Sequence, residues 1–149
     1  ELKNKYGYSN FEVKLNDATQ IENLDTMFDK ILLDMPCSGL GVLRKKPEKI
    51  YELTANDIKN LKKLQKKIFE SAYKSLKNGG EIVYSTCTFS KNENTNNIQY
   101  FLEKYEDLEI LEVEIPEDIE HIRDEFGGVY ISYKNKYMDG FYIAKLRKK

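Results

Sequence analysis

The 149-residue sequence predicts an α/β protein built on a parallel sheet, and two observations support this prediction. Short apolar segments alternate with longer segments whose apolar residues recur every three or four positions, as in strands connected by helices. Residues of catalytic type, among them Asp34, Cys37 and Cys87, come directly after predicted strands. Because ligands gather at the carboxyl ends of parallel strands, these positions also predict a functional site at one sheet edge.

The first predicted strand covers residues 11–15 (FEVKL), which alternate apolar and polar side chains and end at an Asn-Asp pair. An apolar run at residues 28–33 (FDKILL) closes on Asp34 and predicts a strand buried on both faces of the sheet. Residues 35–41 contain proline and glycine and are expected to form a turn after this strand.

A long helix is predicted to begin at Thr54, which forms a capping box with Asp57, and to stop at the Asn-Gly-Gly segment 78–80. Its apolar residues lie at spacings of three and four, which places them on one face. They are Ile58, Leu61, Leu64, Ile68, Ala72 and Leu76.

The next strand is predicted at residues 81–85 (EIVYS), followed by a helix whose capping box is Ser90 with Glu93. The apolar face of this helix consists of Ile98, Phe101, Leu102 and Tyr105. Two further strands are expected at residues 108–115 and 141–146, with an irregular loop or a hairpin between residues 127 and 139.

Composition places the chain among ordinary globular proteins, with 40% hydrophobic and 33% charged residues and a net charge of −1. No apolar run approaches the roughly 20 residues that span a bilayer, and no signal peptide is evident, so we expect no membrane partner and a cytoplasmic protein. One basic cluster consists of Arg44, Lys45, Lys46 and Lys49, and a second of Lys59, Lys62, Lys63, Lys66 and Lys67. Such clusters bind phosphates or simply form the solvated face of a helix.

Two cysteines and one histidine, His121, are too few for a typical zinc site, and we expect no metal. A structural disulfide is uncommon in the cytoplasm, and isolated cysteines are usually small buried apolar residues. Cys37 and Cys87, however, follow consecutive predicted strands. If the helix between them is a crossover, the two thiols face one cleft a few ångströms apart.

The segments around these cysteines resemble the signatures of the Sun (Fmu) family of rRNA cytosine-5 methyltransferases. Residues 34–41 (DMPCSGLG) are similar to its D-A-P-C-S-G-x-G signature, and residues 83–88 (VYSTCT) to V-Y-S-T-C-[ST]. Further similar segments share their order with the family. They are the L-x-x-L-Q helix at 61–68, the L-K-x-G-G segment at 76–80, Glu93-Asn94, and D-G-F-Y-x-A at 139–144.

The resemblance implies an incomplete Rossmann-like class I methyltransferase sheet that uses S-adenosylmethionine as donor. It implies that Cys87 attacks carbon 6 of cytosine, which makes carbon 5 nucleophilic, and that Cys37 assists product release. Asp34 would bind the cytosine ring near nitrogen 3 and also contact the donor. Asp17 corresponds to an acidic residue near the donor's adenine, although an Asn-Asp turn explains its position equally well. A lowered pKa is expected for the Cys87 thiol, with the helix N-terminus at Ser90 as a contributor.

The resemblance also implies an RNA partner, most simply small-subunit rRNA. Arg44, Lys45 and Lys46 match a basic R-x-x-P stretch and are expected to contact phosphates beside the target base. The family's first two strands and its glycine-rich donor loop have no counterpart in the sequence, so we interpret residues 1–149 as a C-terminal fragment of the catalytic domain. Residues 1–25 are then expected to be mispacked or swapped, and the unpaired edge at Ile31 to favour a homodimer.

Four alternatives remain open. A cysteine hydrolase would place a histidine beside the thiolate, and a thiol redox protein usually carries C-x-x-C. A non-catalytic RNA-binding module would explain the basic clusters. A related enzyme that methylates tRNA cytosine would show the same signatures.

Overall fold

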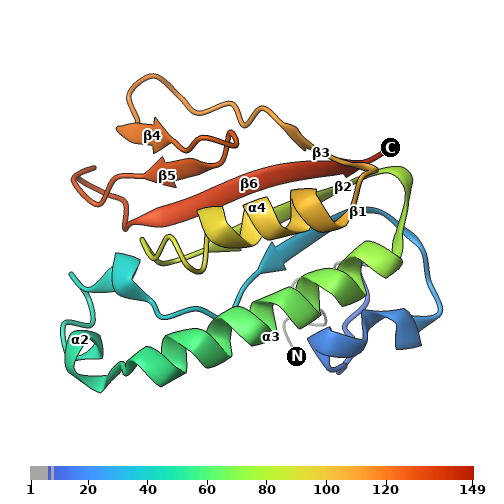
Figure 1. Cartoon of the computed structure of the whole chain (residues 1–149), viewed down its shortest axis with the longest axis horizontal. Helices are drawn as coiled ribbons and strands as arrows, with labels where there is room; N and C mark the ends of the chain where they lie inside the picture. The colour runs from blue at the N-terminus through green and yellow to red at the C-terminus, as the bar shows by residue number, and fades with distance from the viewer. Residues whose placement is uncertain (1–6, 8) are drawn as a thin grey trace.

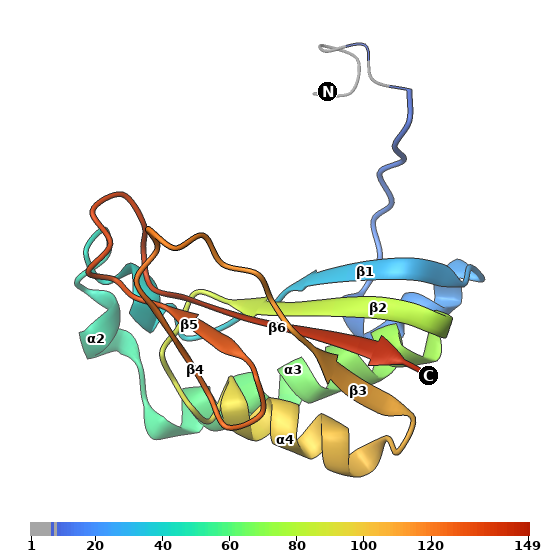
Figure 2. The ribbon, with the colours of Figure 1, turned by 90° about the horizontal axis from the view of Figure 1, so that it is seen from above.

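The computed structural model describes residue 7 and residues 9–149, which form a six-stranded mixed sheet with two long helices on one face (Figures 1 and 2). The strand order is β1-β2-β6-β5-β4. Strand β3 pairs with residues 145–148 of β6, beyond the part of β6 that pairs with β5. The strands are β1 (Phe28–Asp34), β2 (Leu76–Thr86), β3 (Leu108–Leu111), β4 (His121–Arg123), β5 (Val129–Ile131) and β6 (Phe141–Lys148). The helices are η1 (Ala18–Leu24), η2 (Leu40–Val42), α2 (Lys49–Glu52), α3 (Ala55–Lys74) and α4 (Thr95–Lys104).

The predicted α/β class is confirmed, but the sheet is not parallel throughout. Only β1 and β2 run parallel, and β2, β3 and β5 all pair with β6 in antiparallel register. The long helix α3 connects β1 to β2, as a parallel pair requires. From β3 onward the connections contain no helix, and short connections lead to antiparallel neighbours.

The strand predicted at residues 11–15 does not form, and this segment extends away from the body of the molecule (Figure 2). Val13 and Leu15 are exposed. No strand in the described part of the chain pairs with the segment, so its backbone makes no ladder hydrogen bonds. The predictions for residues 1–6 and 8 lie outside the described residues. Residues 18–24 pack on α3, where the Ile21 amide donates to Ser71 Oγ.

Strand β1 lies where the sequence predicts it, but it is not buried on both faces. Leu33 is buried, whereas Leu32 is 72% exposed. The reason is its position, because β1 is the edge strand of the sheet and no helix of the described chain covers its outer face. The unpaired edge expected at Ile31 is therefore present.

Helix α3 begins as predicted, since Thr54 and Asp57 make both hydrogen bonds of a capping box. It ends at Lys74, earlier than the Asn-Gly-Gly stop, and Leu76 is already the first residue of β2. The buried face of α3 is shifted relative to the prediction. It consists of Gln65, Ile68, Phe69, Ser71 and Ala72, and Leu64 is exposed.

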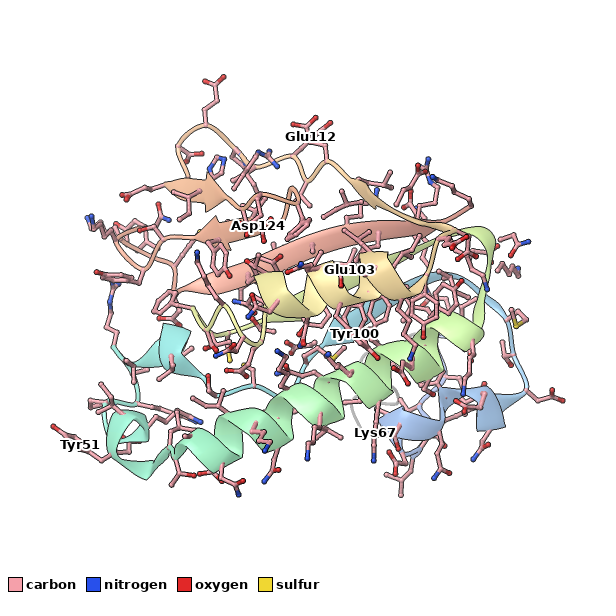
Figure 3. The ribbon with its side chains drawn as sticks, in the orientation of Figure 1. Tyr51, Lys67, Tyr100, Glu103, Glu112 and Asp124 are labelled. Atoms are coloured by element: carbon pink, nitrogen blue, oxygen red, sulfur yellow. The ribbon has the colours of Figure 1, made fainter. Side chains whose placement is uncertain are left out.

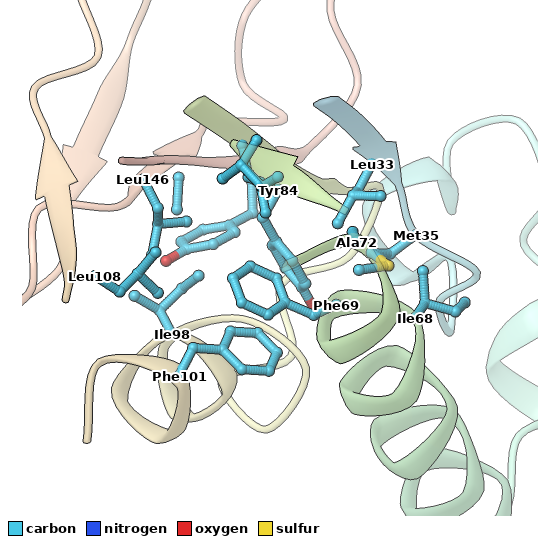
Figure 4. Packing of buried hydrophobic residues seen from close by; sticks show 14 residues of the cluster. Leu33, Met35, Ile68, Phe69, Ala72, Tyr84, Ile98, Phe101, Leu108 and Leu146 are labelled. Atoms are coloured by element: carbon cyan, nitrogen blue, oxygen red, sulfur yellow. The ribbon is translucent and has the colours of Figure 1, made fainter. Parts of the chain in front are cut away.

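The core lies between the sheet and helices α3 and α4 (Figure 4). Phe69 of α3 and Phe101 of α4 stack with ring centroids 3.7 Å apart, and Tyr84 of β2 packs against Phe101 from the sheet. Buried aromatic pairs of this kind stabilise beyond their buried area by about 1 kcal/mol. Nearer the surface, Tyr100 lies between the helices (Figure 3), where Lys66 Nζ is 3.2 Å from its ring centroid.

The C-terminal third departs from the prediction in detail. The strand expected at 108–115 is shorter, and a β4–β5 hairpin covers residues 121–131, of which the sequence predicted only part. Among residues 7 and 9–149, no helix is long and apolar enough to span a membrane.

Candidate active site

The two cysteines meet at the carboxyl ends of β1 and β2, the two parallel neighbours visible side by side in Figure 1. The Sγ atoms of Cys37 and Cys87 are 3.1 Å apart, and both thiols are free. The predicted crossover of α3 produces this meeting, because it returns β2 alongside β1 in parallel register. The prediction that the two thiols lie a few ångströms apart is confirmed.

Contact between the thiols makes them chemically unequal. The hydrogen bond from Cys37 is the largest influence on Cys87 and lowers its pKa to about 7. The same contact raises the pKa of Cys37, and burial raises it further. When the pair loses one proton, the remaining proton therefore stays on Cys37 and the negative charge lies on Cys87, so that Cys87 is the better nucleophile near neutral pH.

The helix N-terminus expected at Ser90, as a contributor to the lowered Cys87 pKa, lies further along the chain. Helix α4 begins at Thr95, and its N-cap residue Asn94 makes no side-chain capping bond. Ser90 and Glu93 form a turn instead of a capping box, with the Glu93 amide bonded to the Ser90 carbonyl. The Glu93 side chain bonds to Ser38 and Gln65 instead of capping the helix.

The Glu93 carboxylate is fully buried and connects the two cysteine-bearing loops. Oε2 accepts hydrogen bonds from the Ser38 amide at 3.0 Å and from Gln65 Nε2 at 3.0 Å, and Oε1 accepts from the Ser38 hydroxyl at 2.6 Å. Ser38 Oγ also lies 2.7 Å from the Thr88 hydroxyl. Because Ser38 and Thr88 each adjoin a cysteine, this network fixes the two thiols relative to each other.

Gln65 and Asn94 extend the same network. Gln65 Nε2 also donates to the Pro36 carbonyl at 2.9 Å, and Asn94 Nδ2 donates to the Thr88 carbonyl at 2.9 Å. The sequence showed that Gln65 and the Glu93-Asn94 pair lie in family-like segments. It did not show that these side chains are buried or that they bond to the segments around the cysteines. The available signal for Gln65 was a polar residue beside the apolar face of α3.

Two glycines allow the segments after Cys37 and Cys87 and the segment before β6 to approach closely. The Gly41 amide donates to the Cys87 carbonyl at 2.9 Å, and the Gly140 amide donates to the Gly41 carbonyl at 3.0 Å. A Cβ on Gly41 would lie 2.0 Å from the Gly140 carbonyl oxygen and 2.8 Å from that of Cys87. Backbone can approach backbone here only without side chains.

Asp34 and Asp17 occupy different environments beside this centre. Asp34 is the exposed last residue of β1, close enough to Cys87 for its charge to oppose thiolate formation. Asp17 caps η1 by accepting from the Thr19 amide at 2.8 Å, and this bond lowers its pKa. Its turn interpretation therefore has direct support, while its predicted contact with a donor stays a prediction.

A pocket of about 440 Å³ lies between η1 and β1 and includes Asp34. Its walls are largely apolar and include Ala18, Ile21, Leu24, Ile31 and Met35. An apolar wall with a carboxylate at the strand end suits the adenosine and charged parts of S-adenosylmethionine. The described residues contain no group of three or more potential metal ligands.

The predicted RNA-binding residues are not equally available. The Arg44 guanidinium donates to the Tyr133 carbonyl and, at 3.5 Å, to that of Lys136. Lys45 forms a 2.6 Å ion pair with Asp139. Lys46 is exposed, and within the described chain its side chain has no hydrogen bond or ion pair. Arg44 and Lys45 thus attach the loop before β6 to the segment that follows Cys37.

Comparison with known proteins matches this geometry to one family. The model of the 16S rRNA methyltransferase RsmB/F family matches residues 2–147. Ribosomal RNA small subunit methyltransferase F of Shewanella piezotolerans is 37% identical over 130 residues, which are 85% of this chain and 27% of that protein. The probable ribosomal RNA small subunit methyltransferase B of Bacillus subtilis is 39% identical over 126 residues, 82% of this chain and 28% of that protein.

Solved structures show the same fold. NSun6 from Pyrococcus horikoshii, solved with SFG, superposes with a TM-score of 0.83 at 32% identity over 98% of this chain and 36% of its own. A methyltransferase homologue from the same organism gives 0.80 at 31% identity, covering 99% of this chain and 48% of its own. The chain spans about a quarter of the length of the curated relatives named above. Together with its Rossmann-like sheet, these matches show that the chain belongs to the RsmB/F family of 16S rRNA methyltransferases.

Proposed function

We propose that this chain forms the acceptor side of an enzyme that transfers a methyl group from S-adenosylmethionine to carbon 5 of a cytosine in small-subunit rRNA. The observation that supports it best is the 3.1 Å contact between Cys37 and Cys87, with the charge on Cys87. Carbon 5 of cytosine is a weak nucleophile, and addition of a thiolate to carbon 6 makes carbon 5 more nucleophilic. The whole protein's activity and RNA partner are part of the same proposal.

Each residue of the pair has one step. Cys87 Sγ bonds to carbon 6, and the electron pair of the ring's 5,6 double bond then becomes available at carbon 5. S-Adenosylmethionine supplies the methyl group to that carbon. A base removes the carbon 5 proton, the double bond re-forms, and Cys87 leaves as a thiolate. Asp34 is proposed to bind the ring near nitrogen 3 while charge develops on it.

Cys37 is suited to assist release because its own state depends on Cys87. The hydrogen bond to Cys87 is the largest cause of the raised pKa of Cys37. Once Cys87 is bonded to the base, that cause disappears and the pKa of Cys37 falls toward the ordinary thiol range. Cys37 can then lose its own proton to water and, as a thiolate, accept the carbon 5 proton at the stage when that proton must leave.

The donor is proposed to bind in the pocket beside β1. Ile21, Leu24 and Ile31 provide an apolar wall, and Asp34 stands at its mouth near the reacting centre. Asp17 precedes Ala18 of the same wall and is proposed to bind a polar edge of the donor. The NSun6 structure was solved with SFG, an analogue of S-adenosylmethionine, which agrees with donor use in the fold.

RNA is proposed to cross the surface formed by the basic segment and the loop before β6. A pocket of about 300 Å³ there is lined by Gly41, Arg44, Phe89 and Tyr133, among others. Phe89 and Tyr133 pack edge to face with centroids 5.5 Å apart, and aromatic rings of this kind stack on unpaired bases. Lys46 offers its charge to a phosphate directly, whereas Arg44 and Lys45 act partly by holding the loop.

The test is covalent trapping by the whole protein. RNA containing 5-fluorocytosine is incubated with S-adenosylmethionine, and the protein–RNA adduct is measured on a denaturing gel. Cys87→Ala is expected to abolish the adduct. Cys37→Ala is expected to accumulate an adduct with ordinary RNA, because release fails. An adduct that persists in Cys87→Ala contradicts the assignment, and matched rRNA and tRNA fragments separate the two substrate classes.

A further inference from the structure

Two negative groups meet at the proposed centre. Asp34 ends β1 and pairs in register with Ser85, two residues before Cys87. The Asp34 carboxylate opposes ionisation of Cys87, and so does partial burial of the thiol. A carboxylate beside a thiolate disfavours the charged sulfur, and a nearby positive charge offsets part of this cost. A cation near the ends of β1 and β2 would therefore add to the stabilisation that the hydrogen bond from Cys37 provides.

Lys49 is the lysine whose side chain lies against the turn that follows Cys37. It is the first residue of the one-turn helix α2, and its side chain lies against the turn at Gly39. Its Cδ, Cε and Nζ atoms all lie 3.1 Å from the point where a Cβ on Gly39 would stand. Gly39 has a φ of +70°, so the turn requires glycine, and the missing side chain leaves room for the lysine.

The neighbouring cations either bond to other groups or are exposed to solvent. Arg44 bonds to carbonyls of the loop before β6, and Lys45 pairs with Asp139. Lys49 is half-buried, whereas Lys46 is exposed. Within the described chain Lys49 has no carboxylate within ion-pair distance, so its ammonium group is not neutralised by a partner of its own.

We propose that Lys49 is a positioning residue of the two-thiol site, whose ammonium group keeps the Cys87 sulfur in its charged form beside the carboxylate of Asp34. This inference rests on the proposed role of Cys87 as nucleophile. From the sequence, Lys49 is only one member of a basic cluster and has no separate function. The positive charge of Lys49 favours the thiolate of Cys87, opposite to the effect of the Asp34 carboxylate.

The test measures the charge on Cys87 without RNA or donor. The rate at which iodoacetamide alkylates Cys87 is followed by peptide mass spectrometry between pH 5 and pH 10. Lys49→Met keeps the apolar stem over Gly39 but removes the charge. If the pKa of Cys87 rises from about 7 by half a unit to one unit, alkylation at pH 7 falls about two- to fivefold.

Two further variants distinguish this effect from general changes. Lys49→Arg keeps the charge and is expected to restore the midpoint of the unchanged chain. Lys63→Met removes an exposed lysine from α3 and is expected to leave the profile in place. Circular dichroism confirms that each variant is folded. A Lys49→Met profile that coincides with that of the unchanged chain, or an equal shift in Lys63→Met, overturns the proposal for Lys49.

Failure of the proposed function has a different signature. If Lys49 has no effect but Cys87 still traps 5-fluorocytosine RNA, only the role of Lys49 is wrong. If Cys87 of the unchanged chain reacts no faster at pH 7 than an ordinary thiol, the nucleophile assignment itself is contradicted. The alkylation profile and the trapping gel therefore report on the two proposals separately.

Discussion

The hydroxyl of Ser38 donates a 2.6 Å hydrogen bond to Oε1 of Glu93, and this contact joins the loop that carries Cys37 to the start of α4. Thr88, next to Cys87, lies 2.7 Å from the same hydroxyl. Since the Ser38 proton points to Glu93, the Thr88 hydroxyl is the donor in that second contact. The distance between the two thiols is thus maintained by a buried carboxylate that touches neither of them.

Glu93→Gln is expected to destabilise the chain by about 2 kcal/mol, because the carboxylate accepts three hydrogen bonds and an amide must turn a donor toward one of those donors. Urea unfolding of the purified chain measures the change. Glu103→Gln, at an exposed site of the neighbouring helix α4 (Figure 3), is the matched control and should stay within about 0.5 kcal/mol. Equal stability of the two variants would show that the buried network is dispensable.

Cys37→Ala is expected to make Cys87 less reactive at neutral pH. The hydrogen bond from Cys37 is the largest cause of the lowered pKa of Cys87, so its removal moves the pKa from about 7 toward the ordinary thiol value of about 8.5. The thiolate fraction at pH 7 then falls, and alkylation slows, while at pH 10 both forms are ionised and react alike. A midpoint that stays near 7 in Cys37→Ala contradicts this account.

Gly41→Ala is expected to destabilise the chain by about 2 kcal/mol or more, since the new Cβ meets two carbonyl oxygens that cannot rotate away. Gly79→Ala provides the comparison. No atom lies within 4 Å of its Cβ position, and only its φ of +77° penalises alanine, by about 1 kcal/mol. Thermal unfolding of both variants ranks them, and a smaller loss at Gly41 than at Gly79 would show that the loops can separate.

S-Adenosylmethionine is expected to bind this chain only weakly on its own. The proposed donor pocket is lined by the edge strand β1, and the sequence contains no glycine-rich loop to hold the donor's charged end. Isothermal titration calorimetry should show no binding in the micromolar range. Micromolar affinity would mean that the wall from Ala18 to Met35 suffices.

The isolated chain is expected to dimerise through β1. Leu32 is 72% exposed on an edge strand, and an unpaired apolar edge favours pairing with another chain. Light scattering measures the mass, and Leu32→Lys should shift a dimer toward monomer. A monomer whose β1 amides exchange freely with solvent contradicts this prediction.

The sequence by itself identified the two cysteines of the proposed reaction centre. The two signatures name Cys37 and Cys87, and the amphipathic pattern of α3 predicts the crossover that brings them together. Local hydrogen-bonding rules correctly placed the capping box of Thr54 and Asp57, because every group in that motif lies within one helical turn. The same rules failed for Ser90 and Glu93, where Ser38 and Gln65, distant in sequence, compete for the carboxylate.

Only the tertiary structure decided what depends on distant partners. The segment at 11–15 has the pattern of a strand but pairs with no strand of the described chain, and β1 has a buried strand's composition at an exposed edge. The basic cluster divides in the same way: Arg44 and Lys45 bind the loop before β6, while Lys49 covers the turn beside Cys37. Periodicity and signatures specify which residues a strand or loop contains. The charge and burial of a side chain depend on segments that pack against it, and those are fixed only when the chain has folded.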